Sequence, residues 1–158
     1  METPKQQLRI EHISQVDEAL GRQVSTLLDE GTFWDKEQGE KFLANKDNSL
    51  FLAFWEGKIA GFLTGYRLQR IDKRKAEVLL YEISVHENFR KRGIGKALIQ
   101  ALKHWAKEVG ADEVWVITNK SNTAAVAMYE SEGGLIEATD EQMYTYKVSD
   151  HIDSTSGE

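Results

Sequence analysis

Hydrophobic residues recur along this chain with two periods, and these periods predict its secondary structure. Alternating or continuous apolar runs of strand length occur at residues 8–13, 50–55, 59–68, 77–85, 114–118, 135–138 and 143–148. Helical spacing occurs at residues 14–30, 35–44, 94–109 and 122–131. The predicted order is therefore β-α-α-β-β-β-α-β-α-β-β. Residues 1–149 are expected to form one domain. Residues 150–158, which carry little to bury, are expected to form a mobile tail.

The segment from Glu77 to Val109 is the centre of this pattern. It reads as a buried strand, a basic loop with two glycines and a long amphipathic helix. The glycines, Gly93 and Gly95, lie where the helix begins, and the basic residues beside them are Arg90, Lys91, Arg92 and Lys96. A helix N-terminus presents unpaired N–H groups and a partial positive charge. We therefore expect this loop to bind a phosphate group.

Composition strengthens this interpretation of the loop. The formal net charge is −6, so a basic loop is a local exception, and we expect no general binding of nucleic acid. The sequence has no cysteine and no histidine pair with the spacing of metal ligands, so we expect no metal site. No apolar run approaches the length of a membrane span, and residues 1–11 lack the apolar core of a signal peptide. A cytoplasmic protein without a membrane partner is the expectation.

Two common phosphate loops do not fit the basic segment. The P-loop would need a glycine at Arg90 and a hydroxyl residue at Ala97, and the dinucleotide fingerprint would need a third glycine at Leu98. The signature that fits is Arg90-x-x-Gly93-x-Gly95, and with it the chain resembles the GNAT superfamily of N-acetyltransferases. The resemblance implies an α/β fold, a three-layer α+β sandwich whose mixed, mostly antiparallel and splayed sheet is flanked by helices. It also implies that acetyl-CoA is the co-substrate.

The resemblance assigns cofactor-binding residues in three places. Its basic loop implies pyrophosphate binding by Arg90, Lys91, Arg92, Gly93, Ile94, Gly95 and Lys96. The strand before the loop implies that the main chain at Ile83, Ser84 and Val85 binds the pantetheine arm. A later stretch, from Asn122 to Gly134, matches the motif NxxAxxLYxxxGF with Met128 for leucine and Gly134 for phenylalanine. It implies that Asn122 contacts the cofactor and that Tyr129 is the general acid.

Tyr129 and Glu82 are the candidate catalytic residues. A phenol with a pKa near 10 suits the protonation of a departing thiolate, although a tyrosine that only packs its helix on the sheet is the alternative. Glu82 interrupts an apolar strand, and we expect it on the same face as Val78, Leu80 and Ser84. Burial there would make its carboxylate a better base for an amine proton, directly or through water. A structural salt bridge with a lysine is the alternative for Glu82.

A closer resemblance concerns the acceptor. Tyr81-Glu82 and its strand are similar to the corresponding stretch of the type I aminoglycoside 3-N-acetyltransferases. This implies direct transfer in a ternary complex to the 3-amino group of a cationic aminoglycoside, an antibiotic-resistance activity, and a homodimer. Candidate acceptor ligands are Tyr81, Asp35 and Glu37, with Asp29 and Glu30 nearby. The aromatic pair Phe33-Trp34 either packs at a helix junction or forms a wall of the acceptor pocket.

Other functions remain open at this point. The acceptor could be another small amine, or an amine of a protein or peptide. The chain could also be a binding module that holds acetyl-CoA and transfers nothing. The presence of both Glu82 and Tyr129 favours catalysis, because a binding module needs neither.

Overall fold

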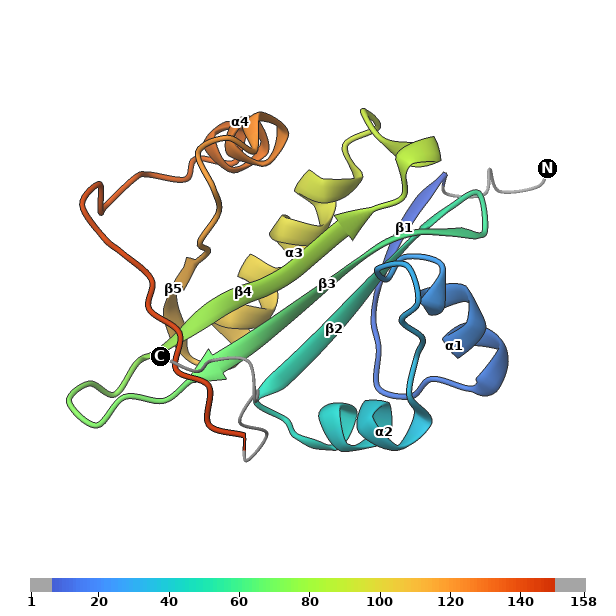
Figure 1. The fold of residues 1–158 in the computed structure, drawn as a ribbon, viewed down its shortest axis with the longest axis horizontal. Coiled ribbons are helices and arrows are strands. Elements are labelled where there is room, and N and C mark those ends of the chain that lie inside the picture. The colour runs from blue at the N-terminus through green and yellow to red at the C-terminus, as the bar shows by residue number, and fades with distance from the viewer. Residues whose placement is uncertain (1–6, 150–158) are drawn as a thin grey trace, which may run out of the picture.

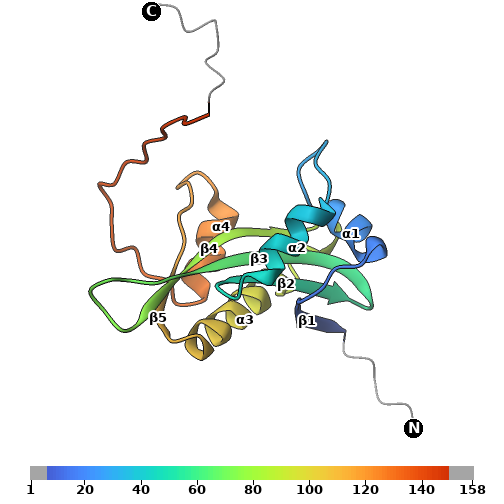
Figure 2. The same ribbon diagram turned by 90° about the horizontal axis from the view of Figure 1, so that it is seen from below.

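The computed structural model describes residues 7–149 as a five-stranded sheet with helices on both faces. The elements are β1 (Leu8–His12), α1 (Glu18–Ser25), α2 (Lys36–Ala44), β2 (Asn48–Trp55), β3 (Lys58–Leu68), β4 (Ala76–Val85), the short 3₁₀ helix η1 (Glu87–Phe89), α3 (Ile94–Glu108), β5 (Ala111–Trp115) and α4 (Thr123–Ser131). The strand order is β1-β2-β3-β4-β5, antiparallel except for the parallel pair β4–β5. Figures 1 and 2 show α3 on one face and α1 and α2 on the other. The predicted fold class is confirmed.

Each face of the sheet carries its own hydrophobic core. Under α3 the core consists of Phe51, Ala53, Ala60, Leu63, Val78, Leu80, Ile94, Leu98, Ile99, Leu102, Trp105 and Ala106. Under α1 and α2 it consists of Ile13, Val24, Leu27, Leu50, Leu52, Phe54 and Phe62. Successive residues of β2 alternate between the two cores, which explains why its sequence is apolar without interruption. None of the helices in residues 7–149 combines the length and the hydrophobicity needed to span a bilayer.

Two predicted elements have the wrong boundaries. The first helix begins at Glu18 rather than after Ser14, because the Asp17 carboxylate caps it by accepting the Leu20 N–H at 2.7 Å. The helix ends at Ser25 and does not reach residue 30. After it, the N–H groups of Thr26, Leu27 and Leu28 each donate to the carbonyl three residues earlier, which is the pattern of a 3₁₀ turn. The predicted strand 114–118 lies at Ala111–Trp115, because its pairing with β4 ends there.

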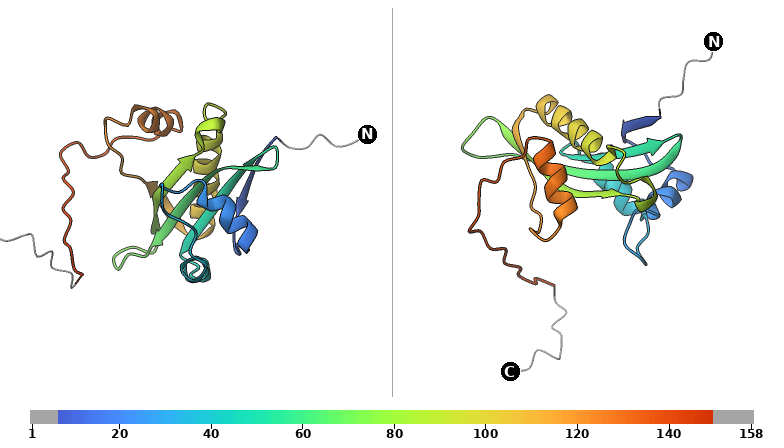
Figure 3. Two further views of the ribbon diagram at one scale, coloured as in Figure 1. Left: turned by 45° about the vertical axis from the view of Figure 1, so that its right-hand side comes forward. Right: turned by 90° about the horizontal axis from the view of Figure 1, so that it is seen from above.

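The two closing strands predicted at 135–138 and 143–148 are also wrong. These residues have no strand pairing in the structure, and they run away from the sheet (Figures 2 and 3). Their large apolar side chains are exposed, namely Leu135, Ile136, Met143, Tyr144, Tyr146 and Val148. The local alternation is present, but a strand also needs a neighbour that accepts its backbone hydrogen bonds. The tail predicted at 150–158 lies outside the described residues.

Candidate functional site

The second half of β4 has a free edge. β5 ends at Trp115, which pairs with Leu79, so β4 continues beyond its parallel neighbour. The N–H of His86 donates to β3 at 2.8 Å. Because hydrogen-bonded and non-hydrogen-bonded pairs alternate along an antiparallel ladder, the backbone groups of Ile83 and Val85 point to the free edge. A strand edge of this kind can bind an extended ligand through its main chain.

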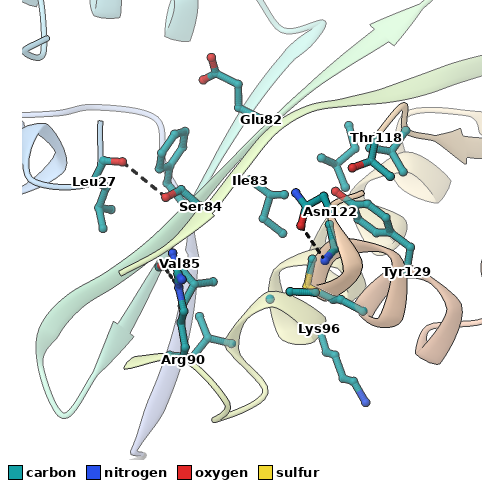
Figure 4. A pocket seen from close by; sticks show the side chains of 18 of the residues that line it. Leu27, Glu82, Ile83, Ser84, Val85, Arg90, Lys96, Thr118, Asn122 and Tyr129 are labelled. Atoms are coloured by element: carbon teal, nitrogen blue, oxygen red, sulfur yellow. Dashed lines mark hydrogen bonds between the residues drawn. The ribbon is translucent and has the colours of Figure 1, made fainter. Parts of the chain in front are cut away.

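A cavity of about 1350 Å³ extends along this edge. β4 forms one wall, and the other walls come from the basic loop, the first turn of α3, the residues after β5, and α4. Figure 4 shows Ile83 pointing from β4 towards Asn122 and Tyr129, whereas Ser84 and Glu82 lie on the other side of the strand. The Ser84 hydroxyl lies 3.5 Å from the carbonyl oxygen of Leu27. The cavity thus brings together most of the residues that the sequence selected.

The N-terminus of α3 opens into this cavity. Asp17, Asp35 and Asn122 cap the other three α-helices of residues 7–149 with their side chains, but α3 begins at Gly93 without a side-chain cap. Gly93 has a φ of +76°, which a glycine adopts without strain. The first N–H groups of α3 are therefore available to an anion, and the helix dipole favours one there.

The basic side chains of the loop divide into two groups. Arg90, Lys91 and Lys96 are exposed and line the cavity, and the Nε of Arg90 donates to the Val85 carbonyl at 3.4 Å. Arg92 does not line it. Its guanidinium lies over the rings of Trp55 and Phe89, at 5.0 Å and 5.5 Å from their centroids. The expected pyrophosphate contact of Arg92 is therefore not part of the cavity geometry.

Helix α4 carries Asn122 and Tyr129 into the cavity. The Asn122 side-chain oxygen caps the helix by accepting the Ala125 N–H at 3.2 Å, which leaves its amide NH₂ group as a donor. The Tyr129 side chain is half-buried, and this burial raises the pKa of its phenol. The phenol thus stays protonated at neutral pH and can give a proton to a leaving group.

The glycine pair after α4 fixes the end of that helix. Gly133 has a φ of +85°, and its N–H donates to the Glu130 carbonyl at 3.0 Å. The Gly134 N–H donates to the Tyr129 carbonyl at 2.9 Å, and a β-carbon at Gly134 would lie 2.8 Å from that oxygen. These two bonds form a Schellman motif. Gly134, which departs from the phenylalanine of the family motif, is thus what this tight turn requires.

A β-bulge in β4 places Glu82. Thr64 of β3 pairs with Glu82, but Gly65 pairs with Leu80, so Tyr81 is an extra residue in β4. Leu80 belongs to the core under α3. Because one extra residue reverses the alternation, Glu82 faces the α1 and α2 side of the sheet instead. The expectation that Glu82 is buried on the face of Leu80 is therefore wrong, and the Glu82 side chain is exposed.

A second cavity, of about 590 Å³, meets the first one at Tyr81 and Glu82. The rings of Tyr66 and Tyr81 contact each other edge to face with centroids 5.3 Å apart. Burial, with Tyr81 and Glu82 nearby, raises the pKa of Tyr66, so its hydroxyl remains a proton donor. Sequence reasoning missed Tyr66 and Thr64. The available signal was the alternation along β3, which places Phe62, Thr64 and Tyr66 on one face of the strand.

The two aromatic residues before α2, Phe33 and Trp34, were expected either to pack at a helix junction or to form a wall of the acceptor pocket. Phe33 is 76% exposed and lines the second cavity. Trp34 also lines it but packs between α1 and α2, where β-carbons at Gly21 and Gly39 would lie 2.8 Å and 2.1 Å from its ring atoms. Both interpretations of the pair, helix junction and pocket wall, are therefore supported.

The candidate acidic ligands of the acceptor are only partly brought together. Asp35 lines the second cavity, but one of its oxygens accepts the Gln38 N–H at 2.9 Å to cap α2. Asp29 lines the first cavity. Glu37 lines neither and pairs with Lys41 at 3.1 Å on the surface, and Glu30 is exposed outside both cavities. None of these four residues lines both cavities, whereas Glu82 does.

Comparison with known proteins agrees with this geometry. The family model described as "Acetyltransferase (GNAT) family" matches residues 16–134, so the chain belongs to this family. The ribosomal protein bS18-alanine N-acetyltransferase of Escherichia coli K12 is 32% identical over 98 residues, which cover 60% of this chain and 62% of that enzyme. N-acetyltransferase family 8 member 3 of Mus musculus is 27% identical over 105 residues, which cover 66% of this chain and 46% of the mouse protein. The matched region thus spans only about half to three-fifths of these two relatives.

A solved structure resembles the chain over a larger share of its length. It is an aminoglycoside acetyltransferase from an uncultured soil metagenomic sample, in complexes with trehalose and with sisomicin. The sequence identity is 30% and 29% in the two complexes, and the TM-score is 0.77 in both. The similarity covers 89% of this chain and 97% of that one.

Proposed function

We propose that this protein transfers the acetyl group of acetyl-CoA to a primary amine. One observation carries the proposal: the free edge of β4 and the uncapped N-terminus of α3 border the same cavity. The backbone groups of Ile83 and Val85 suit an extended amide-containing arm, and the start of α3 suits a pyrophosphate. Ser84, Arg90, Lys91, Ile94, Gly95, Lys96 and Asn122 complete the proposed cofactor site.

The chemistry requires a neutral amine and a proton for the departing thiolate. Glu82 lies where the two cavities meet, so we propose it as the base that takes the amine proton directly or through water. The amine then attacks the thioester carbonyl, the carbon–nitrogen bond forms and the carbon–sulfur bond breaks. Tyr129 is the proposed acid, because its phenol lies in the cofactor cavity and holds its proton at neutral pH. Acetyl-CoA supplies the activated acyl group.

For the acceptor we propose a cationic aminoglycoside, acetylated at its 3-amino group. The similarity to the metagenomic aminoglycoside acetyltransferase supports the class, and Tyr81-Glu82 in β4 supports the position. The second cavity offers aromatic walls for the face of a sugar ring, Phe33, Tyr66 and Tyr81, with Glu82 and Asp35 for ammonium groups. The similarity to the bS18-alanine N-acetyltransferase favours a second candidate, an N-terminal peptide amine.

A product analysis separates these acceptors. Purified protein and acetyl-CoA are incubated with sisomicin, with a polyamine and with a peptide that begins with alanine. Mass spectrometry then detects the acetylated product, and NMR locates the acetyl group. An acetyl group on the 3-nitrogen of sisomicin is the expected result. Acetylation of the peptide or the polyamine alone would contradict the aminoglycoside proposal. It would leave the proposed acetyltransferase activity standing.

We further propose a cytoplasmic homodimer built on one domain, residues 1–149. The apolar side chains of the segment 135–148 support the dimer, because soluble proteins rarely leave so many together in water. Sedimentation that shows one monomeric species at micromolar concentration would contradict it.

A further inference from the structure

Arg92 faces away from the cavity that the other basic residues of its loop line. The centre of its guanidinium lies 5.0 Å from the centroid of the Trp55 ring and 5.5 Å from that of Phe89. A guanidinium within about 6 Å of an aromatic face is attracted by the ring's quadrupole. The side chain therefore connects the loop to the end of β2 and to η1 instead of reaching into the cavity.

The two rings under Arg92 are fixed in place. Trp55 and Phe89 are partly buried, and both pack against the hydrophobic core under α3. Phe89 also meets the His86 ring edge to face at 5.9 Å. Arg92 thus stacks on groups that are packed against the core of the fold.

The loop itself has a backbone that needs support. Lys91 has a φ of +64° and Gly93 a φ of +76°, so the residues on both sides of Arg92 adopt the left-handed backbone conformation. This conformation is strained for a residue with a β-carbon such as Lys91, and it persists only where surrounding contacts impose it. Arg92 lies between these two residues, so its stack on Trp55 and Phe89 can hold the backbone in this conformation. The bond from Arg90 to the Val85 carbonyl lies on the other side of Lys91.

We propose that Arg92 is a positioning residue for the pyrophosphate loop. Stacked on Trp55 and Phe89, it holds the strained backbone so that the uncapped N–H groups of α3 stay exposed to the cavity. This inference rests on the proposed function, because the cavity must bind acetyl-CoA for the position of the loop to matter. The competing explanation is a direct charge contact between Arg92 and a phosphate, which would not involve Trp55.

A double-mutant cycle on CoA affinity distinguishes the two explanations. Arg92→Lys keeps the charge but loses the planar stack, and Trp55→Leu removes a ring that lies outside the cavity. We expect each change to raise the dissociation constant for CoA about tenfold, because a smaller fraction of the protein then has the ordered loop. The double variant should bind no more weakly than the weaker single variant. Trp55→Phe should restore most of the affinity, and turnover at saturating acetyl-CoA should change little.

Arg9 provides a matched control, because its guanidinium lies 4.7 Å from the Phe54 ring, away from both cavities. Arg9→Lys should leave CoA affinity unchanged. Full affinity in Trp55→Leu, or effects of Arg92→Lys and Trp55→Leu that multiply in the double variant, would overturn the proposal. Circular dichroism confirms that each variant is folded, and Trp55→Met replaces Trp55→Leu if the latter is not.

Limited trypsin digestion tests the same idea without a ligand. Trp55→Leu retains every cleavage site in the loop, so faster cleavage between residues 90 and 93 would report a loosened loop. Unchanged cleavage would overturn the inference. Failure of the wild-type protein to bind CoA would contradict the proposed function instead, and the digestion would still decide the role of Arg92.

Discussion

A β-carbon at Gly95 would lie 2.3 Å from the sulfur atom of Met128, so α3 and α4 meet at a point where an alanine would force the Met128 side chain to move. Gly95 lies in the first turn of the proposed pyrophosphate site, and Met128 precedes Tyr129 in α4. Only side-chain atoms of Met128 lie that close, and no backbone atom does. The cofactor loop and the proposed acid are thus linked by one close contact.

The first prediction follows from this contact. Gly95→Ala should push the Met128 side chain aside and disturb the neighbouring Tyr129, lowering turnover more than CoA affinity. Because the Met128 side chain is flexible, the loss of stability should not exceed about 1 kcal/mol. Met128→Ala in the same chain should recover most of both losses, because it removes the atom that clashes. Steady-state kinetics and thermal unfolding of the two single variants and the double variant measure this. Equal damage in Gly95→Ala with and without Met128→Ala would show that the contact does not matter.

The second prediction concerns Gly93. Its φ of +76° penalises most side chains, so the informative comparison is between Gly93→Asn and Gly93→Asp, two residues of similar shape that tolerate this conformation. The aspartate would place a negative charge at the N-terminus of α3, where we propose the pyrophosphate binds. We expect its affinity for CoA to be at least about tenfold lower than that of the asparagine variant. If calorimetry finds equal CoA affinities for the two variants, the pyrophosphate does not bind at the N-terminus of α3.

The third prediction tests the proposed base. Glu82→Gln keeps the shape of the side chain but cannot accept a proton, so turnover should fall roughly 10²–10⁴-fold with little change in CoA affinity. Glu37→Gln is the control, because Glu37 pairs with Lys41 on the surface and lines neither cavity. A Glu82→Gln variant as fast as wild type would exclude Glu82 as the base.

The fourth prediction uses the pKa of Tyr129. Burial raises it, so the folded protein keeps the phenolic proton to a higher pH than the unfolded chain does. The free energy of unfolding should therefore be unaffected by this group below about pH 10 and should decline as the pH rises further. Tyr129→Phe should lessen that alkaline decline and lower turnover roughly 10²-fold at neutral pH. Denaturant titrations at several pH values that show no difference between the proteins would refute the assigned burial.

The sequence was most informative where one segment carries its own signals. The amphipathic pattern of 94–109 and the glycines at its start predicted α3 and its loop, because periodicity and turn chemistry are local properties. The helix predicted at 35–44 and the strands predicted at 50–55 and 59–68 correspond to α2, β2 and β3 for the same reason. The family signature supplied Asn122 and Tyr129, which both line the cofactor cavity.

Features that depend on pairing between distant segments could not be predicted. The bulge at Tyr81 exists only in the register between β3 and β4, and it reverses the face on which Glu82 lies. The end of β5 at Trp115 depends on where β4 diverges from it. The stack of Arg92 on Trp55 joins residues far apart in sequence, and the sequence does not reveal this contact. The sequence therefore indicated that Arg92, like the other basic residues of its loop, binds the pyrophosphate.

The release of free thiol from acetyl-CoA tests the central claim most directly. Purified protein is mixed with acetyl-CoA and sisomicin, and CoA thiol is followed with a colorimetric reagent for the wild-type, Glu82→Gln and Tyr129→Phe proteins. The account predicts amine-dependent release by the wild-type protein and a large loss of rate in both variants. Absence of amine-dependent release by a folded, CoA-binding wild-type protein, across aminoglycosides, polyamines and peptides, would contradict it.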